Sequence, residues 1–211
     1  MLDNNKYTLV NRKYYLKDTL TVAKELLGCY ITKEFPNYTL TGKIVETEAY
    51  LGNDDPACHA YRKVTNRNRP MFEEGGISYV YFIYGNYFCF NVVTERKETG
   101  SAVLIRAVEP IEGINKMRRN RKYPDGDVNL TNGPAKFCMA FNIGRHDNSL
   151  DLTEDRIRIY RSKRKDNFRI AITPRIGIKE GAELPYRFFI KDNPYVTKHK
   201  LNKEIITEIK T

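Results

Sequence analysis

Short runs in which apolar and polar residues alternate recur along the chain and predict a protein rich in β-strands. Because successive strands mostly adjoin along the chain, the pattern favours an α+β fold around an antiparallel or mixed sheet. With 41% apolar residues and no linker, repeat or low-complexity block, we expect one domain over residues 1–211. Strands are expected near residues 29–33, 43–50, 79–84, 87–93, 102–108, 156–160, 168–172 and 186–190.

Helices are predicted where residues that start a helix precede apolar residues at helical spacing. Asp18 is a candidate N-cap for a helix over 19–27. Pro110 is expected to open a helix through residue 118, because proline suits the first helical turn, and Pro134 is expected to open another. In segment 198–211, apolar residues interleaved with Lys and Glu favour a short amphipathic helix, to which we assign no function.

A pair of carboxylates lies on the strand predicted over 43–50. Alternation places Ile44, Glu46, Glu48 and Tyr50 on one face of this strand. Two like charges this close could raise the proton affinity of either carboxyl group. The alternative is a solvated surface pair, because the polar face of a half-buried strand meets water. Spacing alone does not distinguish the two glutamates.

An aromatic-rich hairpin is predicted by two apolar runs on either side of Gly85-Asn86. Glycine supplies the positive φ that a tight hairpin turn requires, so Tyr84 is expected beside the tip. Core packing accounts for most of the aromatic side chains. However, aromatic faces also stack on nucleic-acid bases, at about 1–3 kcal/mol per base, and a large side chain at a hairpin tip can wedge into a base step.

The charge balance favours a polyanionic partner. Lys and Arg number 36 against 26 Asp and Glu, which gives a formal charge of +10. Basic residues cluster at Arg67 and Arg69, at 116–122 and at 156–165, and together with the many tyrosines they make nucleic acid the best single hypothesis. No apolar run of about 18 residues predicts a membrane span, and the polar start over 1–15 does not resemble a signal peptide.

The four cysteines, at positions 29, 58, 89 and 138, lie far apart and include no Cys-x-x-Cys pair. This spacing argues against a zinc site, an iron–sulfur cluster and a disulfide framework. The zinc-deaminase signature, His-x-Glu followed by Pro-Cys-x-x-Cys, is also absent from the sequence. We therefore expect a reduced, intracellular protein whose chemistry depends on carboxylates, amides, aromatic rings and water.

The motifs together resemble those of the alkyladenine, or 3-methyladenine, DNA glycosylase family. The resemblance implies a curved, mostly antiparallel sheet flanked by helices, with a protruding hairpin that intercalates into DNA. Six segments carry this resemblance, in the order in which they occur in the family: IVETEAY at 44–50, TNRNRPMF at 65–72, YVYFIYGNYFCFNV at 79–92, VLIRAVEP at 103–110, GPAKFC at 133–138 and TPRIGI at 173–178.

The resemblance implies a monofunctional enzyme of base excision repair. Members of the family flip a damaged purine, such as 3-methyladenine, 7-methylguanine, hypoxanthine or ethenoadenine, out of duplex DNA and hydrolyse its bond to deoxyribose. The implied partner is double-stranded DNA that contains such a purine. No metal or organic cofactor is implied, and we expect a monomer that is cytoplasmic in a prokaryote or nuclear in a eukaryote.

The resemblance also implies roles for individual residues in the reaction. Glu48 matches the carboxylate that activates the attacking water, Arg106 matches the arginine that helps to hold this water, and Ile176 matches a position whose backbone carbonyl also holds it. A carboxylate suits the role, because departure of the base leaves an oxocarbenium-like sugar that negative charge stabilises.

Further positions match the base pocket and the DNA-contacting surface. Tyr50, His59 and Tyr81 match the residues that enclose the flipped base, and Asn91 matches the polar residue that disfavours a guanine amino group. Tyr84 matches the intercalating residue, and Arg67, Arg69 and Asn86 are candidate DNA contacts. Asn86 stands where the family is expected to carry methionine, which makes the apolar part of the tip smaller.

Two alternatives remain open from the sequence. One is a non-catalytic module that recognises damaged or distorted nucleic acid by stacking and carries Glu48 as a surface acid. The other is an enzyme that acts on RNA, which differs from DNA at each site by the 2′-hydroxyl.

Overall fold

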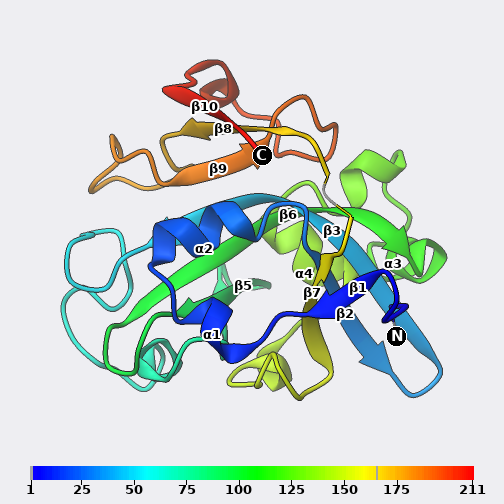
Figure 1. Ribbon diagram of the computed structural model, residues 1–211, viewed down its shortest axis with the longest axis horizontal. Helices are drawn as coiled ribbons and strands as arrows, with labels where there is room; N and C mark the ends of the chain where they lie inside the picture. The colour runs from blue at the N-terminus through cyan, green and yellow to red at the C-terminus, as the bar shows by residue number, and fades with distance from the viewer. Residues whose placement is uncertain (1, 165) are drawn as a thin grey trace.

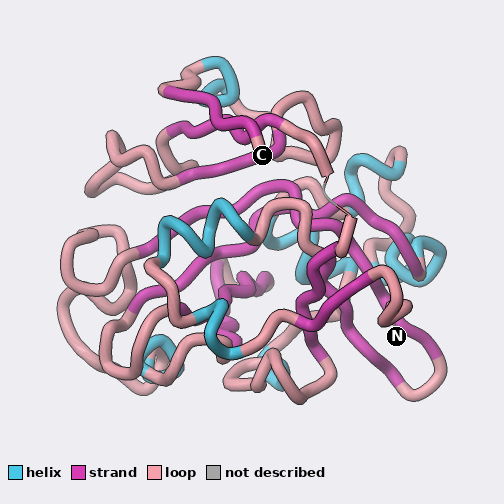
Figure 2. Tube along the Cα trace, in the orientation of Figure 1, coloured by secondary structure: helices cyan, strands magenta, loops and turns pink. Residues whose placement is uncertain are grey.

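The computed structural model describes residues 2–164 and 166–211, so Met1 and Lys165, the last residue of the third basic cluster, lie outside the described part. Figure 2 shows that strands dominate and that the helices are short. Within the described residues, one sheet contains ten strands, which confirms the predicted α+β class. The strands are β1 (Tyr7–Leu9), β2 (Tyr30–Phe35), β3 (Tyr38–Tyr50), β4 (Ser78–Ile83), β5 (Tyr87–Thr94), β6 (Ser101–Glu112), β7 (Ile157–Ser162), β8 (Arg169–Thr173), β9 (Arg187–Ile190) and β10 (Thr207–Lys210).

The 13-residue strand β3 organises the sheet. One of its edges pairs with β6, and the other pairs first with β2 and then, over residues 46–48, with β9. The main path runs β1-β7-β2-β3-β6-β5-β4, and β9, β8 and β10 branch from β3. Every pairing between described strands is antiparallel. In Figure 1, β8, β9 and β10 lie side by side at one end of the molecule.

Four short α-helices lie around the sheet in the described part of the chain. The predicted cap of α2 is confirmed, since the Asp18 side chain accepts a hydrogen bond from the Thr21 N–H at 3.0 Å. The predicted start of α4 at Pro134 is confirmed as well. The α-helices are α1 (Arg12–Tyr15), α2 (Thr19–Glu25), α3 (Ile114–Asn120) and α4 (Pro134–Ala140), and the 3₁₀ helices are η1 (Arg69–Phe72), η2 (Asp127–Leu130), η3 (Arg145–Asp147) and η4 (Lys200–Lys203).

Two helix predictions are wrong. Pro110 does not open a helix: it pairs with Gly42 inside β6, and α3 begins only after Gly113, whose φ of 78° turns the chain away from the strand. The segment 198–211 forms η4 and β10 instead of an amphipathic helix. β10 pairs with β8 along its length, so the free edge of the sheet determines the conformation of this segment.

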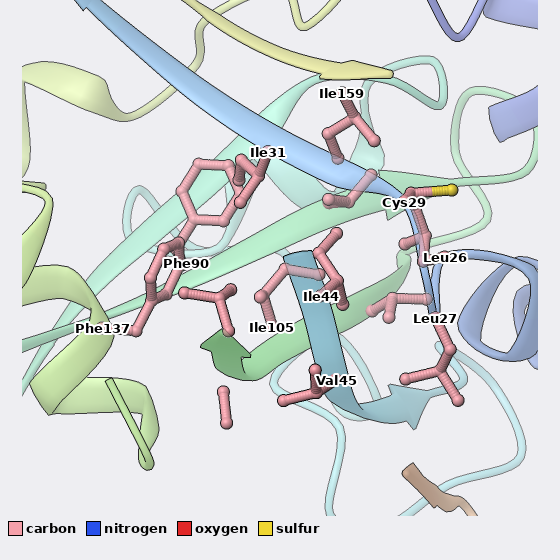
Figure 3. Close-up of a cluster of buried hydrophobic side chains, with 14 of the residues drawn as sticks. Leu26, Leu27, Cys29, Ile31, Ile44, Val45, Phe90, Ile105, Phe137 and Ile159 are labelled. Carbon is pink, nitrogen blue, oxygen red and sulfur yellow. The ribbon is translucent and has the colours of Figure 1, made fainter. Parts of the chain in front are cut away.

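The hydrophobic core lies between the sheet and its short helices. Figure 3 shows Ile44, Val45 and Ile105 from the central strands in one buried cluster with Phe90 on β5. The ring of Phe90 meets Phe137 of α4 edge to face, at a centroid distance of 6.2 Å. This packing fixes the central strands that carry the predicted catalytic residues.

The pairing of β3 with β6 is irregular beside the carboxylate pair. Its register shifts on both sides of Glu46: Val45 has no Cα partner on β6, and Arg106 has none on β3. Such bulges redirect side chains, and they are frequent beside active sites. Glu46 and Glu48, which were predicted to share one face of this strand, both contact the Arg106 guanidinium.

The predicted hairpin is formed by β4 and β5, but its turn begins one residue earlier than expected. Tyr84 and Gly85 both have positive φ, at 50° and 72°, and the Asn86 N–H donates to the Ile83 carbonyl at 3.4 Å. Tyr84 is thus itself a turn residue, and its side chain is 83% exposed. The aromatic side chain at the tip stands free of the protein surface.

All four cysteines are buried free thiols. Burial raises the pKa of Cys29 and of Cys58 to about 12, and it raises the pKa of Cys89 and Cys138 as well. The thiols therefore keep their protons at neutral pH. Separately, none of the described helices combines the length and the apolar character needed to cross a membrane.

Candidate active site

The carboxylate of Glu48 is completely buried on β3 and is held by donors from three segments. Its Oε1 accepts a hydrogen bond from the Ile176 N–H at 2.8 Å, and its Oε2 accepts one from the Tyr50 hydroxyl at 2.9 Å. Nη1 of Arg106 lies 3.1 Å from the same Oε2. A carboxylate oxygen can accept two hydrogen bonds, so Oε1 has an acceptor position to spare. Ile176 thus contacts Glu48 through its N–H, and the expected contact of its carbonyl with the attacking water stays a prediction.

Glu46 is equally buried but is enclosed by donors on both of its oxygens. Oε1 accepts from Nε of Arg106 at 3.0 Å and from Nε of Arg187 at 2.7 Å, and Oε2 accepts from the Thr197 N–H at 2.8 Å. Burial alone would raise the pKa of Glu46, but the two arginines and the Thr197 N–H together hold it below its ordinary value. The rise in proton affinity that we expected from the neighbouring carboxylate is therefore wrong for Glu46.

Arg106 links the two glutamates. Burial would lower its pKa, but the carboxylates of Glu48 and Glu46 raise it, so the guanidinium is a permanent cation. β6 pairs with β3 on one side and with β5 on the other. The Arg106 side chain is buried between the two carboxylates.

An aromatic cavity adjoins Glu48. It has about 260 Å³ of empty volume and brings together four predicted pocket residues. The Tyr50 hydroxyl donates to Glu48 from the wall of this cavity, and burial followed by the Glu48 charge raises the pKa of Tyr50 well above its ordinary value. Tyr50 is therefore a neutral donor. The cavity is lined by Tyr50, His59, Tyr81 and Asn91, and also by Ala57, Met71, Tyr79 and Ala102.

His59 is held in the cavity wall by aromatic neighbours. Its Nδ1 lies 3.0 Å from the Tyr79 hydroxyl, and its ring meets Tyr81 edge to face at a centroid distance of 4.6 Å. The Asn68 side-chain amide donates to the His59 carbonyl at 2.7 Å and fixes the backbone. His59 as a whole residue is exposed at the mouth of the cavity, but the protein around its ring, and then the nearby Arg67 cation, lower its pKa. The imidazole is therefore neutral at neutral pH.

We expect His59 to gain its proton at a lower pH than an ordinary histidine, whose pKa is about 6.5. Because the pKa of His59 is lower in the folded than in the unfolded protein, protonation of His59 favours the unfolded state. The contribution of neutral His59 to the stability of the fold is therefore complete above about pH 6.5, and it is lost as the pH falls through the pKa of the folded protein. NMR titration of the imidazole nitrogens measures this pKa. Arg67→Ala should raise it, Arg69→Ala should not, and protonation of His59 above pH 6.5 would contradict the prediction.

A buried ion pair supports the cavity wall behind Tyr50. Arg175 Nη2 donates to Asp55 Oδ1 at 2.7 Å, and Nη1 donates to the Ala49 carbonyl at 2.9 Å. The Arg175 guanidinium lies 4.7 Å from the centroid of the Tyr50 ring. Asp55 also accepts from the Ala57 N–H at 3.1 Å. The pair therefore joins β3 to the loop that carries two of the lining residues.

The candidate DNA contacts do not form one group. Arg67 Nη2 donates to the Phe82 carbonyl at 3.2 Å, and the guanidinium lies 5.3 Å from the Tyr81 ring centroid, so Arg67 lies beside the hairpin that carries Tyr84 and Asn86. Arg69 lines a different groove. Within residues 2–164 and 166–211, no cluster of three or more His, Cys, Asp or Glu side chains could hold a metal ion. The metal-free reaction stays a prediction.

Four residues that line or support the site were not predicted from the sequence: Asp55, Tyr79, Arg175 and Arg187. Tyr79 could have been found, because alternation along β4 puts it on the same face as Tyr81. Arg187 is a single charge at the start of the apolar run RFFI, which is a signal for a buried cation that needs an acidic partner. Its partner Glu46 lies 141 positions earlier, so only the fold reveals the pair.

Comparison with known proteins supplies independent evidence. The family model described as "Methylpurine-DNA glycosylase (MPG)" matches residues 13–194. A protein of Clostridium botulinum (strain Alaska E43 / Type E3) is 47% identical over 201 residues, which cover 90% of this chain and 99% of that protein. One of Carboxydothermus hydrogenoformans is 47% identical over 192 residues, with the same coverage. One of Francisella tularensis subsp. tularensis is 47% identical over 183 residues, covering 85% and 94%. All three bear the name "Putative 3-methyladenine DNA glycosylase".

Proposed function

The chain belongs to the methylpurine-DNA glycosylase family, and from this membership we propose that it hydrolyses the N-glycosidic bond of a damaged purine in double-stranded DNA. The substrates are alkylated and deaminated purines of the 3-methyladenine, 7-methylguanine, hypoxanthine and ethenoadenine class. The damaged nucleotide rotates out of the duplex, and the reaction leaves an abasic site. The observation that carries this proposal is the position of the buried Glu48 carboxylate, which accepts a hydrogen bond from Tyr50 in the wall of an aromatic cavity.

Glu48 is the proposed general base. It takes a proton from a water molecule, whose oxygen bonds to C1′ of the deoxyribose while the bond from C1′ to the base breaks and its electron pair leaves with the base. The carboxylate also stabilises positive charge that develops on the sugar. The acceptor position left on Oε1 supports this role, and the contacts of Tyr50 and Arg106 with Oε2 orient the carboxylate.

The departing base needs different help in different lesions. A cationic methylpurine takes up the bonding electrons and departs as a neutral molecule. Hypoxanthine is neutral in the nucleotide, so it must gain a proton to depart as a neutral base. We therefore expect the release of a cationic methylpurine to need less help from the enzyme than the release of hypoxanthine.

The cavity is proposed to hold the flipped base between Tyr50 and Tyr81. Its lining of aromatic rings with a few polar groups suits one base. Aromatic faces stack on any base and additionally attract a cationic one. Asn91 Nδ2 donates to the Tyr79 carbonyl at 3.0 Å, so its amide is held in one orientation. A fixed amide supports its proposed role in disfavouring a guanine amino group.

The hairpin is proposed to enter the duplex and replace the flipped nucleotide. The exposure of Tyr84 at the tip supports this role, and Arg67 and Asn86 beside it are suited to contact the DNA backbone. One protein engages one flipped nucleotide, so we propose that the enzyme acts as a monomer.

Replacement of Tyr84 by alanine should weaken lesion processing without harming the fold. Loss of one stacking aromatic costs about 1–3 kcal/mol, which corresponds to a fall of about 5- to 150-fold in the single-turnover rate at subsaturating enzyme. Tyr123→Ala, which removes another exposed tyrosine shortly after the end of α3, is the matched control and should leave the rate unchanged. An unaltered rate in Tyr84→Ala would contradict the proposed insertion.

The function is tested by single-turnover assays on duplexes that contain one hypoxanthine or one ethenoadenine, with hot alkali to reveal abasic sites. Release of 3-methyladenine from alkylated DNA is measured in parallel. Strand breaks that appear only after alkali support a monofunctional glycosylase, whereas breaks without alkali contradict it.

The same assays separate the alternatives. Tight lesion binding with no release of any of the three bases would favour a non-catalytic binding module. Faster release from a ribose strand than from a deoxyribose strand would favour an RNA-directed enzyme. The 2′-hydroxyl disfavours an oxocarbenium-like sugar, so we expect the deoxyribose strand to react faster.

A further inference from the structure

Glu46 is the centre of a buried charge cluster behind Glu48. It holds Arg106 and Arg187 on one oxygen and the Thr197 N–H on the other. Its side chain is completely buried, and it is not among the residues that line the aromatic cavity. Any influence of Glu46 on the reaction must therefore pass through its neighbours.

Arg106 is the neighbour that reaches Glu48. A guanidinium is planar and rigid, so fixing one edge fixes the direction of all of its donors. With Nε bound to Glu46 at 3.0 Å, Nη1 meets Glu48 Oε2 at 3.1 Å. Without Glu46, the same guanidinium is free to form the two parallel hydrogen bonds that arginine and carboxylate prefer. The second of these bonds would occupy the acceptor position on Glu48 that the water requires.

Arg187 and the C-terminal segment hold Glu46 from the other side. Arg187 lies on β9, which pairs with β3 and belongs to the group of three strands at one end of the molecule in Figure 1. Its Nη1 donates to Thr173 Oγ1 at 3.0 Å, and its Nη2 donates to Asn202 Oδ1 at 2.8 Å. Asn202 also donates to the Thr197 carbonyl at 3.0 Å. The backbone that binds the second oxygen of Glu46 is thereby fixed as well.

We propose that Glu46 is a positioning residue that fixes the Arg106 guanidinium and so leaves one Glu48 oxygen free for the attacking water. This inference rests on the proposed function of Glu48. The segment 197–202 then has a part in the reaction although it lines no part of the cavity. The segment fixes Glu46, and Glu46 fixes Arg106.

The test is the double variant Glu46→Leu/Arg187→Met, because leucine cannot accept a hydrogen bond from Nε of Arg106. Glu46→Leu alone leaves Arg187 as a buried cation without its carboxylate and could fail to fold, whereas the double variant removes both charges together. We expect its single-turnover release of hypoxanthine to be about 10²-fold slower, since small misplacements of a reacting group cost that much. We expect its Kd for a duplex with a 2′-fluorinated, uncleavable lesion nucleotide to stay close to that of the wild type, because the base cavity is untouched.

A control separates positioning from a general loss of stability. Lys33→Met/Asp147→Asn removes another completely buried ion pair, 2.7 Å long, which makes no contact with Arg106. This control should unfold at lower urea concentration than the wild type but release hypoxanthine at the wild-type rate.

Glu48→Gln, assayed beside these variants, distinguishes the inference from the proposed function. If the Glu46 double variant releases base at the wild-type rate while Glu48→Gln does not, the positioning role is wrong and the role of Glu48 stands. If Glu48→Gln releases base at the wild-type rate, both are wrong. Slow release by the double variant with unchanged Kd, and wild-type release by the control, supports the positioning role.

Discussion

Replacement of Glu48 by glutamine is expected to slow base release by about 10²–10⁴-fold, the contribution typical of a general base. Glutamine keeps the size of the side chain. Its oxygen can still accept from the Ile176 N–H, and its amide nitrogen can donate to the Tyr50 hydroxyl, so the cavity should keep its shape. It cannot take a proton from water. Lesion binding should therefore persist while release is lost, as measured by single-turnover rates and by the Kd for the same hypoxanthine duplex.

Glu183→Gln is the matched control, because Glu183 is an exposed glutamate and should tolerate the change without loss of rate. Release by Glu48→Gln at the wild-type rate would show that another group activates the water. Weak binding together with slow release would instead show that Glu48 supports the cavity more than the chemistry.

Replacement of Asp55 by alanine should destabilise the fold by about 3–5 kcal/mol, the usual cost of removing one partner from a buried ion pair. The side chains of Asp55 and Arg175 have no exposed surface, so the remaining Arg175 cation cannot turn into water. The loop would also lose the acceptor for the Ala57 N–H, which helps to hold this part of the cavity wall. The midpoint of urea unfolding measures the loss of stability.

The neighbouring Asp54 provides a close control, since it is exposed. Asp54→Ala should change the free energy of unfolding by no more than about 0.5 kcal/mol. A loss below about 1 kcal/mol in Asp55→Ala would mean that Arg175 finds other partners, such as the Gly181 carbonyl at 3.4 Å.

Local sequence signals predicted the elements that depend on local physics. The Asp18 cap, the Pro134 helix start and the apolar runs of β4 and β5 each depend on residues within a few positions of one another. The aromatic cavity was predicted through the family resemblance, and the structure places Tyr50, His59 and Tyr81 around one cavity.

Features set by distant contacts could not be predicted in this way. Segment 198–211 has the composition of an amphipathic helix but becomes β10, because β8 offers an unpaired edge. The register shifts around Glu46 depend on how β3 and β6 pair, and no short window of sequence encodes them. Alternation also treats the two glutamates alike: the family resemblance selects Glu48, and the contacts of Arg187 and Thr197 with Glu46 are seen only in the structure.

The burial of all four thiols has a practical consequence for following the protein in solution. Alkylating reagents attack the thiolate, and burial both shields these sulfur atoms and keeps them protonated. A maleimide dye should therefore meet no competing native thiol in the folded protein. One cysteine introduced at the exposed turn residue Asn86 would then carry a fluorophore next to the hairpin tip, and its emission could report the arrival of DNA without removal of any native cysteine.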